Sequence, residues 1–219
     1  MPVFTVTALL FDCDGVLVDS LDAAAVAWNE WGTRWKPGFD FHRDVEHGRR
    51  LTDFVAELVG PEDAAEAAAE LAALERDHAV DVHGIPGAAA LLANLPAGRW
   101  AVVTSGTRDI ATARLTAAGI PTPAVLVTAD DVAKGKPSPD PYLLAAHQLD
   151  LPPYDCAVFE DAAAGVTAAQ RAGVRTIIGV GTAVTMPGTS AAVPDLRGIT
   201  FDGARLFVGE SDTCPQHQT

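Results

Sequence analysis

Short apolar segments rich in β-branched residues recur through this sequence, and each is followed by turn residues and then by a segment of helical character. Such segments predict buried strands, and we expect five of them, at residues 6–11, 100–103, 125–127, 156–159 and 176–180. Helices are expected at residues 108–118, 141–149 and 162–172. Alternating strands and helices, with the strands apolar along their length, indicate an α/β fold, a Rossmann-like parallel sheet covered on both faces.

The stretch of residues 19–83 differs, because it is rich in alanine and has almost no strand character. Trp28, Trp31 and Trp35 follow at spacings of three and four, so they share one helical face, and we interpret them as helix packing. Residues 61–77 predict a further amphipathic helix. We therefore expect two domains: an α/β core of residues 1–18 and 84–219, and an inserted helical-bundle domain of residues 19–83.

The chain is strongly acidic, since 15 basic and 29 acidic side chains among 219 residues give a formal charge of -14. This charge repels nucleic acids and anionic membrane surfaces, so neither is expected as a partner. Three distant cysteines form neither a disulfide framework nor a CxxC metal motif, and no apolar run reaches membrane-spanning length, so we expect a cytoplasmic protein. No exposed apolar stripe is evident for a partner subunit, and a monomer is expected.

Polar residues follow the predicted strands at their carboxyl ends, where an open parallel sheet binds its ligands. They are Asp12 and Asp14 after the first strand, Thr104 and Ser105 after the second, Lys134 and Lys136 after the third, and Glu160 and Asp161 after the fourth. Carboxylates, hydroxyls and amines are thus all delivered to one edge of one sheet.

The two acidic pairs point to a metal. Taken alone, Asp12 and Asp14 also fit a solvated turn, because aspartate is common where strands end. The second pair, Glu160 and Asp161, weakens that interpretation, since four uncompensated acids at close quarters repel and raise one another's pKa. A divalent cation resolves the conflict, and Mg²⁺ prefers carboxylate and carbonyl oxygens and often bridges them to a phosphate. These four residues are the predicted metal site.

The remaining polar residues suit phosphate chemistry. A phosphoryl group in transfer carries negative charge on its equatorial oxygens, where cations and hydrogen-bond donors stabilise it. We expect Lys136 to supply charge, and Thr104 and the backbone N–H groups near Ser105 and Gly106 to supply hydrogen bonds. The alternatives stay open: Lys136 fits a surface lysine, and Thr104 and Ser105 fit an ordinary turn or a helix N-cap. For Lys134 we prefer the surface interpretation.

Four segments carry a more specific signal: FDCDGVLVDS at 11–20, VVTSG at 102–106, KGKPSPDPYLLAA at 134–146 and FEDAAAGVTAA at 159–169. In this order they resemble the haloacid dehalogenase-like (HAD-like) hydrolases, specifically phosphatases with a helical cap inserted after the first motif. The resemblance implies Asp12 as nucleophile and Asp14 as general acid and then base. It also implies Thr104 as the phosphate-binding hydroxyl, Lys136 as the phosphate-stabilising cation, Glu160 and Asp161 as metal-side carboxylates, and the backbone carbonyl of Asp14 as a Mg²⁺ ligand.

A finer similarity concerns the substrate. Residues 100–111, 127–143 and 47–53 resemble bacterial sugar phosphatases and the fungal glycerol-phosphate and deoxyglucose-phosphate phosphatases. This implies a phosphoric monoester hydrolase acting on a small sugar or polyol phosphate through an aspartyl phosphate. Candidate substrate contacts on the helical insertion are Glu30, His47, Arg49 and Arg50, each of which also fits a solvated surface residue. Arg50 is preferred, because its turn resembles a cap segment that faces the active site in relatives.

Three rival functions remain. A sugar phosphomutase of the same family would return the phosphoryl group from Asp12 to another hydroxyl, and the motifs barely separate it from a phosphatase. A dehalogenase fits less well, because that chemistry does not need an acid at Asp14 to protonate an alkoxide. A non-catalytic binding or regulatory protein on the same fold is opposed by the intact set of Asp12, Asp14, Lys136 and Asp161.

Overall fold

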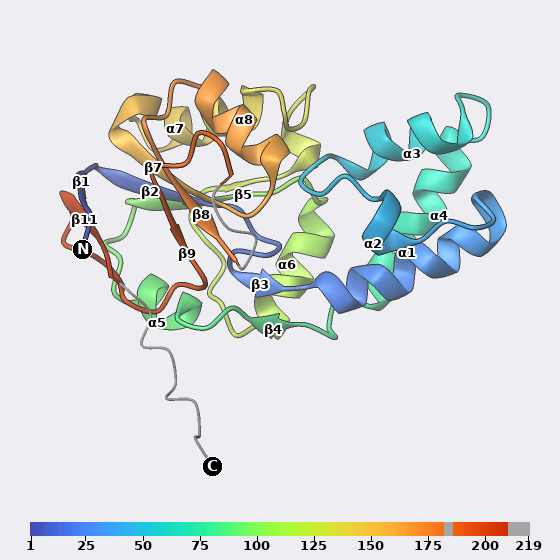
Figure 1. Cartoon of the computed structure of the whole chain (residues 1–219), viewed down its shortest axis with the longest axis horizontal. Helices are drawn as coiled ribbons and strands as arrows, with labels where there is room; N and C mark the ends of the chain where they lie inside the picture. Colours follow the sequence, from blue (N-terminus) through green and yellow to red (C-terminus); the bar gives the residue numbers. More distant parts are fainter. Residues whose placement is uncertain (182–185, 210–219) are drawn as a thin grey trace, which may run out of the picture.

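A six-stranded parallel sheet forms the centre of the computed structural model, which describes residues 1–181 and 186–209 (Figure 1). Its strand order is β6-β5-β2-β7-β8-β9. The strands are β2 (Ala8–Phe11), β5 (Trp100–Val103), β6 (Leu126–Val127), β7 (Cys156–Glu160), β8 (Thr176–Val180) and β9 (Ala191–Val193). The predicted α/β parallel sheet is confirmed. The edge strand β9 was not expected, because it has three residues and carries no long apolar run; Val193 is its one buried residue.

Helices cover both faces of this sheet. In Figure 1, α7 (Asp140–Gln148) and α8 (Ala163–Arg171) lie on one face, and α5 (Ala88–Ala93) and α6 (Arg108–Ala117) on the other. Successive strand residues point to opposite faces, so β2 places its side chains in two separate apolar clusters. The expected helices at 108–118, 141–149 and 162–172 match α6, α7 and α8 to within one residue at each end.

A unit of four helices, residues 21–77, projects from the core and is called the helical unit below (Figure 1). Its helices are α1 (Leu21–Trp35), α2 (Phe41–Asp44), α3 (Leu51–Val59) and α4 (Ala64–Asp77). They enclose a third apolar cluster of their own, in which Trp28 and Trp31 are buried with ring centroids 5.8 Å apart. Nε1 of Trp31 donates to the carbonyl of Ala67 at 2.9 Å. The interpretation of these tryptophans as helix packing is confirmed.

The chain enters and leaves the helical unit through a short antiparallel pair. Strand β3 (Val18–Asp19) pairs with β4 (His83–Gly84), in the register Val18 to Gly84 and Asp19 to His83. We propose that the boundary between the α/β core and the inserted domain of residues 19–83 runs through this pair.

A second, antiparallel sheet lies at the other end of the core, near the N-terminus (Figure 1). It contains β1 (Val3–Thr5), β10 (Ile199–Phe201) and β11 (Arg205–Val208) in the order β1-β11-β10. The expected strand at 6–11 is therefore too long at its start, since β2 begins at Ala8 after a separate strand β1. Two short 3-10 helices, Ala129–Asp131 and Pro153–Asp155, complete the elements of the described residues.

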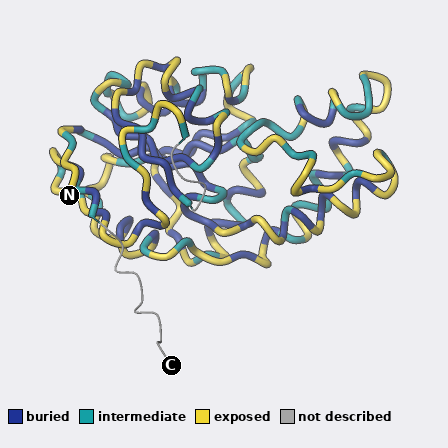
Figure 2. The backbone as a smooth tube through the Cα atoms, viewed as in Figure 1, coloured by how far each residue is buried: buried dark blue, intermediate teal, exposed yellow. Residues whose placement is uncertain are grey.

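Figure 2 shows buried backbone concentrated in the central sheet and on the inner sides of the helices. Cys13 and Cys156 are buried with free thiols, and Cys214 lies outside the described residues. Across the part of the chain that the structure describes, each helix is too short or too polar to cross a membrane.

Candidate functional site

The predicted site residues gather where β2, β5 and β7 end. Phe11 is in register with Val102 on one side and with Phe159 on the other, so these strands end at the same level. Asp12, Thr104 and Glu160 follow directly at or just after those ends. The backbone N–H of Asp12 donates to the carbonyl of Phe159 at 3.0 Å and fixes its position. The parallel register thus assembles the site as the sequence predicts.

Lys136 lies at the centre of a buried network. Its ammonium donates to Oδ1 of Asp12 at 2.7 Å, to Oε1 of Glu160 at 2.6 Å and to the carbonyl of Val103 at 3.0 Å. All three donors of the ammonium are therefore used. Burial opposes the charge, but the two carboxylates hold the pKa of Lys136 well above its usual value. The surface alternative for Lys136 is wrong, whereas Lys134 is exposed as preferred.

Glu160 is fixed on all sides. Besides Lys136, the hydroxyl of Tyr142 donates to its Oε1 at 2.7 Å, and the backbone N–H groups of Asp161 and Ala162 donate to its Oε2, each at 3.1 Å. A Cβ at Gly165 would lie 1.7 Å from Oε1, so only glycine leaves room for this carboxylate. Glu160 is thus positioned rigidly beside Asp12.

Oxygens of Asp12, Glu160 and Asp161 lie within 4.8 Å of one another. Burial raises the pKa of Asp12 to about 7 against the opposing effect of Lys136, and burial also raises the pKa of Asp161 well above its usual value. The carboxylate of Asp161 accepts no hydrogen bond from the described residues, and Gly15 would place a Cβ 2.0 Å from its Oδ2. Mg²⁺ prefers oxygen ligands, and these three carboxylates provide them. Because one ammonium faces three carboxylates, the cluster also has the excess negative charge that a divalent cation offsets.

The carboxylate of Asp14 lies outside this cluster. Its Oδ1 accepts a hydrogen bond from the hydroxyl of Ser20 at 2.7 Å and from Nη1 of Arg114 at 2.9 Å. Its side chain keeps 32% of its surface exposed, so it remains reachable from solvent. Asp14 as a metal ligand therefore depends on its backbone carbonyl, and its carboxylate is available for proton transfer.

The turn after β5 lies beside Asp12. Oγ1 of Thr104 accepts the N–H of Gly106 at 3.0 Å, and Oγ of Ser105 donates to the carbonyl of Gly48 in the helical unit at 2.7 Å. The N-cap alternative for Thr104 and Ser105 is wrong, because Thr107 occupies the N-cap of α6. Ser105 instead links the core to the helical unit.

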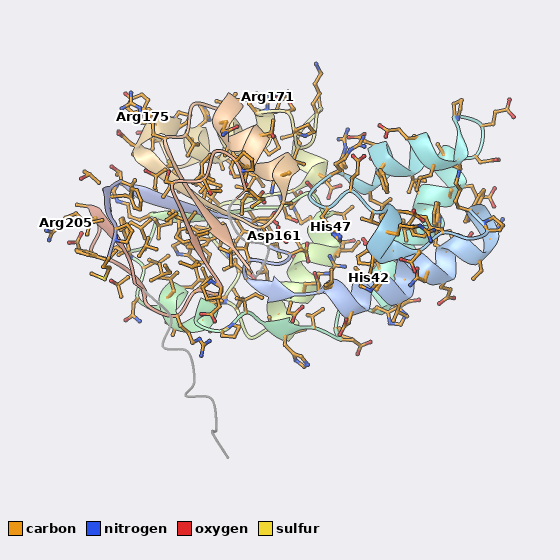
Figure 3. All side chains as sticks on the ribbon, in the orientation of Figure 1. His42, His47, Asp161, Arg171, Arg175 and Arg205 are labelled. Atoms are coloured by element: carbon orange, nitrogen blue, oxygen red, sulfur yellow. The ribbon has the colours of Figure 1, made fainter. Side chains whose placement is uncertain are left out.

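A cavity of about 150 Å³ opens between this sheet edge and the helical unit. Its core wall includes Asp12, Asp14, Thr104, Ser105, Gly106, Arg114 and Asp161, and its helical wall includes Trp28, Phe41, His47, Arg49, Phe54 and Glu75. Figure 3 shows Asp161 on the core and His47 on the helical unit, on facing sides of the region between them. A small ligand in this cavity would contact both parts of the chain.

Of the four predicted substrate contacts on the insertion, two line the cavity and two do not. His47 and Arg49 line the cavity, although the guanidinium of Arg49 pairs with Glu46 and Glu57. Glu30 is exposed and lies outside the cavity lining.

The preferred contact, Arg50, does not line this cavity in the structure. Its guanidinium donates to both oxygens of Asp53, at 3.0 and 2.9 Å, and to the carbonyls of Val132 and Ala133, at 3.2 and 3.1 Å. Asp53 and the carbonyls of the core loop thus hold the side chain of Arg50, and its contact with the substrate stays a prediction. Arg50 joins the helical unit to the core.

Arg114 and Glu75 are among the polar residues of the site that were not anticipated. Arg114 is buried on α6, and its Nη2 lies 3.9 Å from Oε1 of Glu75 on α4, which also accepts Nε1 of Trp28 at 3.0 Å. Burial raises the pKa of Glu75, while Arg114 opposes that effect. One signal was available: Arg114 follows Ile110 by four residues, on the apolar face of an amphipathic helix.

The chain matches the family model described as haloacid dehalogenase-like hydrolase over residues 6–173. Hexitol phosphatase A of Escherichia coli (strain K12) is 44% identical over 173 residues, which cover 77% of this chain and 80% of that protein. Glycerol-1-phosphate phosphohydrolase 2 of Saccharomyces cerevisiae (strain ATCC 204508 / S288c) is 37% identical over 190 residues, or 81% of this chain and 75% of that protein. A solved hydrolase from Pseudomonas syringae has a TM-score of 0.76 at 28% identity, over 87% of this chain and 94% of that one.

Proposed function

Because this chain belongs to the haloacid dehalogenase-like hydrolases, we propose that it is a Mg²⁺-dependent phosphatase acting on a small sugar or polyol phosphate through an aspartyl phosphate on Asp12. The family resemblance seen in the motifs is confirmed, and the chain is a phosphoric monoester hydrolase like its named relatives. The metal, the covalent intermediate and the residue roles are the proposal.

One observation carries it: the buried ammonium of Lys136 joins Asp12 to Glu160, and Asp161 adds a third carboxylate close to both. Stability alone does not explain this group, since a buried charge network costs desolvation that an apolar core avoids. A phosphoryl group bound at Asp12 would meet the Lys136 ammonium and the Thr104 hydroxyl. The network thus supplies the charge that phosphoryl transfer requires.

The proposed reaction has two steps. An oxygen of Asp12 attacks phosphorus, and the bond from phosphorus to the sugar oxygen breaks while Asp14 donates a proton to that oxygen. Asp14 then takes a proton from a water molecule, whose oxygen attacks the aspartyl phosphate and releases inorganic phosphate. Ser20 and Arg114 hold Oδ1 of Asp14 in place for both transfers.

Asp12, Glu160, Asp161 and the carbonyl of Asp14 would hold Mg²⁺, which supplies positive charge that offsets the carboxylates and the phosphate. The helical unit covers the cavity and limits the access of water during transfer. The cavity volume suits a small substrate, and the named substrates of two relatives, a hexitol phosphate and glycerol 1-phosphate, are both polyol phosphates.

The test is phosphate release from a panel of sugar and polyol phosphates and from p-nitrophenyl phosphate, with Mg²⁺ or with a chelator. We expect turnover only with Mg²⁺, and a phosphorylated Asp12 peptide after rapid quenching. Release of an isomeric sugar phosphate in place of inorganic phosphate would support the mutase. Absence of turnover on every ester would support a binding protein.

A further inference from the structure

Glu75 is a largely buried acid of the helical wall. It lies near the end of α4, lines the cavity opposite Asp12 and Asp14, and exposes 12% of its side chain. Its Oε1 accepts Nε1 of Trp28 at 3.0 Å and lies 3.9 Å from Nη2 of Arg114. One oxygen of the carboxylate is thus fixed by neighbours from α1 and α6.

The other oxygen of Glu75, Oε2, accepts no hydrogen bond from the described residues. Among the described residues, Nε of Arg114 is the one fully buried side-chain nitrogen or oxygen without a partner. Oε2 of Glu75 has no partner either, but it is not fully buried as Nε of Arg114 is. It therefore keeps some accessible surface. Glu75 lines the cavity, so a ligand there can contact its carboxylate.

The acidic residues that line the cavity limit the charge that a bound ligand can carry. Asp19, Glu46 and Glu75 line the cavity, and the arginines that line it, Arg49 and Arg114, are both engaged by carboxylates. A second anionic group on a substrate would meet these acids without a free cation. A neutral hydroxyl can instead donate a hydrogen bond to a carboxylate, which is stronger than a bond between neutral groups.

We propose that Oε2 of Glu75 accepts a hydrogen bond from a hydroxyl of the leaving group, so that the enzyme selects uncharged polyhydroxylated esters over esters with a second anion. This specificity role rests on the proposed phosphatase function. Trp28 and Arg114 hold Glu75 in position for it.

The helical unit contains a matched control. Glu70 lies five residues earlier on the same helix, its Oε2 accepts Nε1 of Trp35 at 3.0 Å, and it pairs with Arg34. This is the same set of glutamate, indole and guanidinium, but Glu70 does not line the cavity. Replacing Glu70 therefore changes the same chemistry outside the site.

The experiment measures kcat/KM of wild type, Glu75→Gln and Glu70→Gln with saturating Mg²⁺ on glycerol 1-phosphate, p-nitrophenyl phosphate and phosphoglycolate. We expect Glu75→Gln to lose about ten- to a hundred-fold on glycerol 1-phosphate, since a hydrogen bond to a charged acceptor is lost. Its loss on p-nitrophenyl phosphate should be several-fold smaller, and its preference against phosphoglycolate should weaken. Glu70→Gln should behave as wild type on all three.

Equal losses by Glu75→Gln on all three esters, or no loss on glycerol 1-phosphate, would overturn the role of Glu75 and leave the phosphatase function standing. A wild type inert toward every ester would overturn both. If Glu75→Gln does not fold, as judged by its circular dichroism, Glu75→Asp replaces it. That variant keeps the charge, so it should retain the preference against phosphoglycolate while losing activity on glycerol 1-phosphate.

Discussion

The two walls of the cavity are built differently. On the core wall, Asp12 is nearly inaccessible, and hydrogen bonds of 2.6 to 2.7 Å link it through Lys136 to Glu160, which both lie behind the wall. On the helical wall, Glu75 lies 3.9 Å from Arg114 of the core wall, and Arg49 keeps 18% of its side chain exposed. Parallel strands hold the chemistry rigidly, whereas packed helices present the side chains that meet the substrate. The predictions below test that division.

The largest effect is expected from Lys136→Met, behind the core wall. It leaves Asp12 and Glu160 buried without their cation, at a cost of about 3 to 5 kcal/mol in the free energy of unfolding. Turnover should fall about a thousand-fold or more, because the phosphoryl charge loses its ammonium. Urea unfolding and phosphate release measure the two losses. Lys134→Met, two residues away and exposed, should change neither the unfolding free energy nor the turnover. A Lys136→Met enzyme of normal activity would contradict the proposed mechanism.

Arg114→Lys tests the residue that bridges the walls. A lysine cannot contact Asp14 and face Glu75 together as the forked guanidinium does. We expect kcat to fall about ten- to a hundred-fold with a smaller change in KM, because the proton donor is misplaced and not the phosphate site. Steady-state kinetics check this. Arg175→Lys, on the far side of the core in Figure 3, serves as control. If Arg114→Lys changed KM and left kcat unaltered, Arg114 would act in binding alone.

Metal removal should make stability depend on pH. In the metal-free protein the pKa of Asp12 is about 7, above its usual 3.8, so the folded state keeps a proton that the unfolded state has lost. The free energy of unfolding should therefore fall as pH rises from about 4 to about 7, by at most about 1.4 kcal/mol per unit for one group. Asp161, shifted in the same direction, adds to the fall.

Urea unfolding at about pH 5 and about pH 8, with a chelator or with Mg²⁺, measures this dependence. Mg²⁺ favours the charged carboxylates, so it should flatten the profile. A fall of equal size with Mg²⁺ would mean that these carboxylates do not bind the ion.

The smallest effect is expected from Arg50→Gln. The side chain lies outside the cavity and joins Asp53 to the carbonyls of Val132 and Ala133. KM for a polyol phosphate should change by less than about threefold, and the unfolding free energy should fall by about 1 kcal/mol. A tenfold rise in KM for polyol phosphates, without one for p-nitrophenyl phosphate, would return Arg50 to the substrate.

The sequence predicted the core wall better than the helical wall, for a physical reason. Apolar strands and the residues that follow them are local signals, and parallel register brings Asp12, Thr104 and Glu160 together without further information. The meeting of Glu75 with Arg114 depends on how two helices pack across an interface, and no spacing within either helix encodes it. Arg50 shows a related case: its guanidinium pairs with Asp53, which the local resemblance did not indicate, and its contact with the substrate stays a prediction.

The register of β3 with β4 has a further consequence. Asp19 and His83 are direct partners, so the chain leaves the core and returns to it at a single point. Topologically, everything between them is the tip of one β-hairpin, enlarged into a bundle of helices. Because β3 and β4 pair outside the central sheet, the segment between them can change without altering a pairing in that sheet. The side chains that face the substrate can then diverge while the carboxylates at the strand ends stay in place.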